Sequence, residues 1–323
     1  MIFNGIAATT EVDRHNCRIE KKALDNAAQE MNNGLYAPGV GLEHDLSIFP
    51  IGKAYYGEVK PMENGEYALH IKQDIFFDDC VRVENPNGEI LYWGESKLDH
   101  RPFADTEHCI LDHPKISIDP VNFKEQSFND ISKFIQDECK IDFGVIMRKS
   151  LVPDPEVFVE LLTGTLLTLA GKKAVEKIAD ALAVDIVKGY DYLKKVIKKI
   201  AQHAIPKNRP ITYVFREIAD DSYVIELIIK TVNPDDVLMA TQEDKIANVI
   251  DKINHVTTLV NDSIAKIQFL YEHTISEWKF NYLTTKTGQV WGTEECYKRT
   301  ATIINKQFTQ FSVEGNICEP EDE

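Results

Sequence analysis

Residues Leu151–Val159 read L-V-P-D-P-E-V-F-V, and this stretch decides how the chain is organised. Two prolines two positions apart suit neither a helix interior nor a central strand. Upstream, the apolar residues favour short strands joined by turns. From Glu156 to Ala204 they recur about every 3.6 residues instead, which is the helical period. The change of period predicts a boundary at Pro155.

The two sides of this boundary predict an α+β protein with two modules. Residues 1–155 are expected to form a β-rich module, and residues 156–313 a helix-led α/β module with antiparallel strands. The last residues, 314–323, are acidic and are expected to be disordered.

Charge and composition exclude some classes of protein. The chain of 323 residues carries a net charge of −16, of which −11 lies in residues 1–155. This balance argues against nucleic-acid binding through a basic surface. The start of the chain has no basic stretch followed by an apolar run, and the most apolar stretch, Val157–Ala170, is shorter than the ~20 residues of a membrane span. Six scattered cysteines without a CxxC pair fit reduced thiols, so a cytoplasmic protein is predicted.

Within the first module, turn signals predict two hairpins. Asn64-Gly65 lies between the apolar runs 53–62 and 66–76, and Asn-Gly readily adopts the positive φ that tight turns need. A second hairpin is expected to turn at 85–88. Strands are also expected at Ile2–Ala8 and around Ile116–Ile118.

The second module is predicted to alternate helices and strands. The expected order is a helix from Glu156, strands at 211–218 and 223–231, a helix over 242–274, a strand with an aromatic face, and a last helix from Thr293.

Three short patches of the first module resemble the prohead maturation proteases of tailed phages, whose fold is related to herpesvirus assembly proteases. The first patch is Asp13–Asn16 followed by Ala23-Leu24, similar to that family's "D-R…A-L/F" segment. The second is His44-Asp45 followed by Pro50–Gly52, similar to "H-D…P-I-G". The third is Ser150–Pro155, which resembles the end of the protease domain.

This resemblance implies acyl transfer by a serine activated through a histidine base and an acid. His44 would be the base, and Ser117 the nucleophile. Arg148 stands where the family carries its glutamate, and a cation cannot stabilise an imidazolium. Asp142 could substitute only with a shifted geometry, and Asp119 replaces the glycine expected after the serine. The resemblance therefore implies a prohead-protease-like barrel with a degenerate site that binds a protein or peptide partner in phage assembly or recognition, with or without cleaving it.

Other patterns leave two further functions open. Residues 171–209 hold ten basic side chains against four acidic ones, opposite an apolar stripe. A core-facing helix explains this pattern best, but a membrane-acting effector would share it. The near-heptad seam of 242–274 fits packing within the chain, or a homo-oligomer in a non-enzymatic interaction protein.

No cofactor or metal is predicted. The segment 99–113 gathers three histidines, Cys109 and several carboxylates, yet its spacing matches no familiar metal motif and favours a polar loop. The chain also lacks a Gly-rich phosphate loop and a dinucleotide fingerprint.

Overall fold

The structure is a computed structural model that describes residues 1–12, 18–42, 45–85, 87–104, 111, 113–146, 155–171, 180–219 and 223–313. Side chains are described within these ranges except at 180–191 and 307–313. The described chain is a mixed α+β fold built on two sheets.

The smaller sheet is antiparallel and curled, with the strand order β1-β4-β3-β2. Helix α1 (Lys21–Asn33) packs its buried face against β3 and β4. The predicted hairpin turns at Gly65, which has a φ of +82°. The strands are β1 (Ile2–Thr9), β2 (Gly39–Val40), β3 (Gly52–Pro61) and β4 (Tyr67–Ile75).

The larger sheet has ten strands in the order β5-β6-β14-β13-β12-β11-β10-β9-β7-β8. Three neighbouring pairs are parallel, namely β7 with β8, β9 with β10, and β11 with β12, and the others are antiparallel. The second predicted hairpin, β5–β6, and the predicted pair β10–β11 are confirmed. The strands are β5 (Val81–Glu84), β6 (Ile90–Glu95), β7 (Lys115–Ile118), β8 (Asp142–Val145), β9 (Glu156–Leu161), β10 (Ile211–Ala219), β11 (Tyr223–Thr231), β12 (Ile264–Glu272), β13 (Glu277–Thr285) and β14 (Gln289–Thr293).

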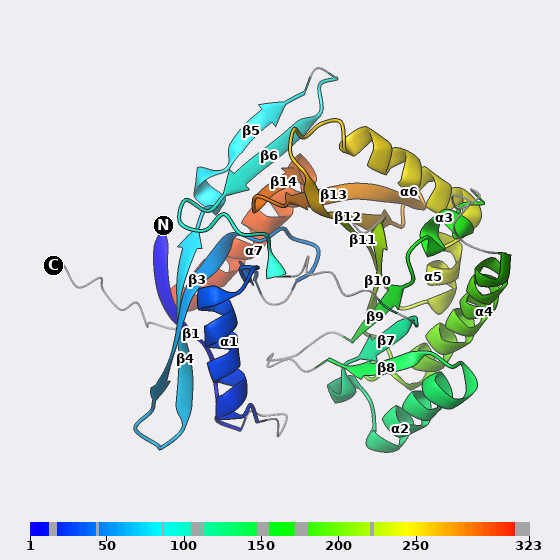
Figure 1. The fold of residues 1–323 in the computed structure, drawn as a ribbon, viewed down its shortest axis with the longest axis horizontal. Helices are drawn as coiled ribbons and strands as arrows, with labels where there is room; N and C mark the ends of the chain where they lie inside the picture. The colour runs from blue at the N-terminus through cyan, green and yellow to red at the C-terminus, as the bar shows by residue number, and fades with distance from the viewer. Residues whose placement is uncertain are drawn as a thin grey trace.

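Helices and loops cover both faces of the larger sheet (Figure 1). Helices α2, α4, α5 and α6 lie on the side away from the smaller sheet, where they enclose the main apolar core. On the opposite face, a second core gathers Phe49, Phe103 and Tyr282 with residues of α7. The helices are α2 (Glu125–Lys133), continued by a π-helical turn (Phe134–Glu138), α3 (Thr165–Leu169), α4 (Asp180–His203), α5 (Pro234–Ala240), α6 (Glu243–Val256) and α7 (Glu294–Val313).

Two predicted helices are wrong over part of their length, for one physical reason. Glu156–Leu161 is strand β9, so a strand and not a helix follows Pro155. The helix expected over 242–274 ends at Val256, and Ile264–Glu272 is strand β12. Both strands are covered on both faces, so their apolar residues are not confined to alternate positions and can mimic a helical period.

The seam proposed for oligomerisation is therefore shorter than predicted, and it packs inside the chain. Ile246, Val249, Ile253 and Val256 of α6 are buried in the main core. None of the described helices is both long enough and apolar enough to span a membrane.

Strands from both sides of Pro155 belong to the larger sheet. β7 pairs antiparallel with β9, and β6 pairs antiparallel with β14. Residues before and after the predicted boundary thus share one sheet and one core. The predicted tail, 314–323, lies outside the described residues.

Candidate functional site

Ser117, the predicted nucleophile, lies in the middle of β7 and is only 8% exposed. Its two neighbours across the sheet are Gly144 on β8 and Phe158 on β9. A Cβ added at Gly144 would come closer than 3.0 Å to Ser117 Oγ, so the hydroxyl sits directly over this glycine. The hydroxyl is therefore enclosed within the sheet rather than presented at its surface.

Asp142, the predicted substitute acid, lies on the same face of the sheet as Ser117 and is exposed. Its cross-strand partner is Lys115, whose side chain passes over Gly144 and forms an ion pair with Glu160 at 3.3 Å. Among the described contacts, no hydrogen bond joins Ser117 to Asp142. A lysine stem, not an imidazole, is the described neighbour of Ser117 on this side.

The remaining members of the predicted site are only partly described. His44 and Arg148 lie outside the described residues. Asp119 is buried, and its carboxylate accepts a hydrogen bond from the amide of Val121 at 2.8 Å, which caps the 3-10 turn Pro120–Asn122. The acid at the position of the expected glycine thus has a local structural role. The described residues place Ser117 and Asp142 on adjacent strands without connecting them.

A network of buried charges, which sequence reasoning missed, lies on the same sheet. Glu226 on β11 is 1% exposed and accepts from Arg216 Nε at 2.5 Å. Lys266 Nζ lies 3.8 Å from its other carboxylate oxygen, and Gln268 donates to that oxygen at 2.6 Å. Burial disfavours the charged carboxylate, but the two cations and the amide outweigh it and hold the pKa of Glu226 at about 2.

This Glu226 network connects the sheet to the segment that follows His44. Gln268 donates to the carbonyl of Leu46 at 3.0 Å, and Asn281 donates to that of Ser47 at 2.8 Å. Arg299 of α7 also donates to Ser47 O, at 3.2 Å. The charges are paired, Glu226 and Lys266 are closed to solvent and Arg216 is partly exposed, so the network fits a structural role better than a reaction centre. Charges inside the apolar runs of β11 and β12 were the sequence signal.

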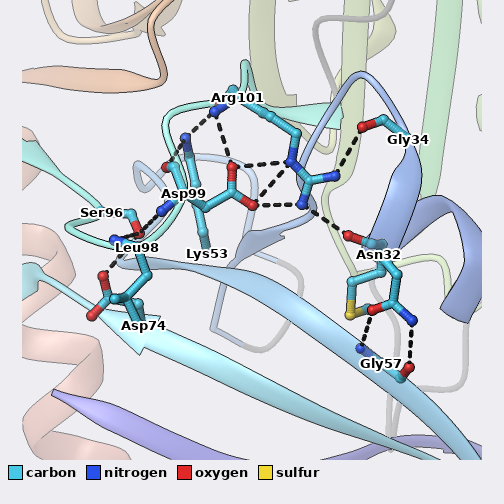
Figure 2. A network of polar contacts seen from close by, with 10 residues as sticks. Asn32, Gly34, Lys53, Gly57, Asp74, Ser96, Leu98, Asp99 and Arg101 are labelled. Atoms are coloured by element: carbon cyan, nitrogen blue, oxygen red, sulfur yellow. Dashed lines mark hydrogen bonds and ion pairs between the residues drawn. The ribbon is translucent and has the colours of Figure 1, made fainter.

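A second network surrounds Lys53 of β3, which is 0% exposed (Figure 2). Its ammonium donates to the carbonyl of Asp99 at 2.9 Å and to that of Arg101, and lies 4.7 Å from the ring centre of Phe103. Burial lowers the pKa of Lys53 to about 8, against the opposing charge of Asp99.

Arg101 extends this network to the end of α1. It pairs with Asp99 at 2.5 Å and donates to the carbonyls of Met31 and Gly34 at 2.8 and 2.9 Å (Figure 2). Lys53 and Arg101 thus hold the loop after β6 against the smaller sheet. An amine without exposed surface is not available as a nucleophile.

The outer edge of β1 is the most accessible unusual feature. Among the described strands, only β4 pairs with β1, which leaves its other edge open. The strand Ile2–Thr9 contains no charged residue and no proline. Three of its large apolar side chains are exposed, Ile2 at 61%, Phe3 at 56% and Ile6 at 56%.

Potential metal donors do not gather in the part of the chain described here. Within it, no group of three His, Cys, Asp or Glu side chains could hold an ion. Asp99 of the donor-rich segment is bound to Arg101, and residues 105–110 and 112 of that segment lie outside the described ranges.

Comparison with known proteins does not identify a family for this chain. No family model, curated protein or solved structure matches this chain significantly. The likeness to prohead proteases therefore stays a prediction from the three sequence patches.

Proposed function

We propose that this chain is a binding protein that takes up an extended segment of a protein partner as an added strand on β1. The open edge of β1 is the observation that carries the proposal. Exposed strand edges invite pairing, and soluble proteins usually protect them with charges, prolines or covering elements. Ile2–Thr9 carries no such charge or proline.

The backbone of β1 is arranged for strand addition. Met1 O accepts from the amide of Ile75 on β4, so in the alternating antiparallel pattern residues 3 and 5 also face β4. The amide and carbonyl groups of Ile2 and Asn4 then point to the open edge, ahead of the register shift between Ile6 and Ala8. Main-chain hydrogen bonds would give affinity, and the exposed side chains of Ile2, Phe3 and Ile6 would select apolar residues in the partner.

The surroundings of Ser117 favour binding over proteolysis. The hydroxyl is enclosed, and its described neighbour is Lys115 with its charge paired to Glu160. In the same proposal, residues 1–155 correspond to a prohead-protease-like barrel. Strands β5–β8 of this part belong to the larger sheet, and strands β1–β4 form the separate curled sheet. A partner from phage assembly or phage recognition remains the prediction of the resemblance.

The test uses Asn4→Pro in the full chain. Proline removes an amide that faces the open edge and leaves the β1–β4 hydrogen bonds in place. Extended peptides selected from a random display library against the wild type should lose binding to this variant. Bound peptide should also slow hydrogen exchange at the amides of Ile2 and Asn4. The matched control is Asn87→Ser, in the β5–β6 turn away from β1.

Three outcomes would overturn the proposal. They are the absence of any selected peptide, equal binding to Asn4→Pro, and labelling of Ser117 by a fluorophosphonate that is lost in Ser117→Ala. Light scattering of the wild type without peptide shows whether a second copy of the chain is the partner strand.

A further inference from the structure

A cleft of about 570 Å³ lies where the β13–β14 hairpin meets the end of β6 and the segment before β12. It is distant in sequence from β1 and independent of the proposed strand addition. The side chains that define this Trp291 cleft are Glu95, His100, Asp262, Thr287, Gln289 and Trp291.

The polar side chains of the cleft are held in place by one another. Gln289 and Glu95 are cross-strand partners, and Gln289 Nε2 donates to Glu95 Oε2 at 3.3 Å. The indole Nε1 of Trp291 donates to Gln289 Oε1 at 3.3 Å. Across the cleft, Asp262 accepts from the amide of Ser263 at 2.6 Å and from the hydroxyl of Thr287. The cleft is therefore lined by an indole and two carboxylates that are each held by a hydrogen bond.

The ionisable side chains that line the cleft are two carboxylates and the imidazole of His100. Glu95 and Asp262 line it, and no lysine or arginine is among its lining residues in the described chain. Two described lysines lie near the cleft without lining it: Lys53 is buried with its ammonium on the carbonyls of Asp99 and Arg101, and the exposed Lys286 precedes Thr287 in the turn. Burial raises the pKa of Asp262, but the hydrogen bonds from Thr287, Thr285 and the Ser263 amide prevail and lower it, so this carboxylate is an anion at neutral pH.

We propose that the Trp291 cleft binds an alkylammonium group, such as a lysine side chain of a partner, with its charge between Glu95 and Asp262 and its alkyl stem on Trp291. A cation near an aromatic face and two carboxylates gains from both, and the stem covers apolar surface. A neutral ligand would have to desolvate both carboxylates without neutralising them.

The probe is N-acetyl-lysine methylamide, and its matched neutral control is N-acetyl-norleucine methylamide. Isothermal titration calorimetry on the full chain should show binding of the lysine compound that weakens with added salt. Glu95→Gln should weaken it by about tenfold, as loss of one charge partner near a surface implies. Glu84→Gln makes the same change on exposed β5 outside the cleft and should leave the affinity unchanged.

A second measurement, an NMR titration, shows where the ligand binds. The indole N–H resonance of Trp291, assigned by Trp291→Phe, should shift on titration, while that of the buried Trp278 should not. Asp262→Asn should also weaken binding. If that variant unfolds, Glu95→Gln still tests the proposal. Glu95 is half-buried and its side chain has one described hydrogen bond, so this substitution is expected to leave the fold intact.

The proposal is overturned by no binding of the lysine compound, by equal binding of the norleucine compound, or by equal affinity in Glu95→Gln. Binding of uncharged saccharides in place of the ammonium compound would overturn it too. None of these results bears on peptide binding at β1, which Asn4→Pro tests separately.

Discussion

Gly288→Ala is expected to destabilise the fold strongly, because Gly288 lies against the head of the buried Lys53. Gly288 has a φ of +81°, which costs alanine about 1 kcal/mol. A Cβ there would also approach both Lys53 Nζ and the carbonyl oxygen of Arg101 to less than 3.0 Å. The ammonium is fixed between two carbonyls, and the other atom belongs to the backbone, so neither moves cheaply. Overpacking of this kind costs about 2 kcal/mol, for a total of about 3 kcal/mol.

Gly65→Ala is the matched control. Gly65 has a φ of +82°, but a Cβ there meets nothing within 4 Å, so only the backbone cost of about 1 kcal/mol remains. Urea denaturation followed by circular dichroism should therefore separate the two variants by about 2 kcal/mol at an unchanged m value. Lys53→Met should reduce the cost of Gly288→Ala, because it removes one of the two overlapping atoms. Equal losses in Gly288→Ala and Gly65→Ala would refute the reasoning.

Three further predictions concern buried titratable groups. The folded pKa of Lys53 is about 8 against 10.5 in the unfolded chain, so between these values the unfolded state binds more protons and the free energy of unfolding should rise with pH. Denaturation at pH 7.5 and 10 should show this rise in the wild type and not in Lys53→Met. Glu226→Gln should cost about 3–5 kcal/mol, because it removes the carboxylate that pairs with the buried Lys266 and the partly exposed Arg216. Since the folded pKa of Glu226 is about 2 against 4.5 when unfolded, the wild type should lose stability as pH falls from 4.5 through 2, a loss that Glu226→Gln should not share. Burial raises the thiol pKa of Cys80 to about 12 and of Cys296 to about 11, so both should react slowly with Ellman's reagent at pH 8 until the protein is unfolded; rapid native labelling mapped to either by mass spectrometry would contradict this.

The parts of the fold that could be predicted from the sequence are those encoded locally. Asn64-Gly65 specified the β3–β4 hairpin, because few residues other than glycine adopt a φ of +82° cheaply. The wrong helix over 264–272 is the converse case. There, Ile264, Ile267 and Tyr271 satisfy a helical spacing, and only pairing with β11 and β13 makes the segment a strand.

The candidate sites show the same contrast between what local sequence encodes and what long-range pairing determines. Ser117 was placed correctly on a strand, yet the register that puts Gly144, and not an acid, beside the serine depends on long-range pairing. The Glu226 network joins residues from β10, β11 and β12, and its carboxylate and lysine come together only across the sheet. No local sequence pattern shows that these two side chains come into contact.

The change of period at Pro155 falls within the larger sheet, because strands from both sides of it pair with each other. A strand covered on one face shows alternation, whereas β9 is covered on both faces and does not. Two buried contacts then join the sides of this point: Lys53 lies against Gly288, and Asn281 holds the carbonyl of Ser47. In the first contact, Gly288 of the second half covers an ammonium that Asp99 and Arg101 of the first half satisfy; in the second, Asn281 of the second half satisfies a carbonyl of the first half. A cut at Pro155 would expose the β7 edge that pairs with β9, uncover the Lys53 ammonium beside Gly288 and remove the Asn281 donor from the Ser47 carbonyl, so residues on both sides of Pro155 contribute to the same sheet and to shared buried contacts.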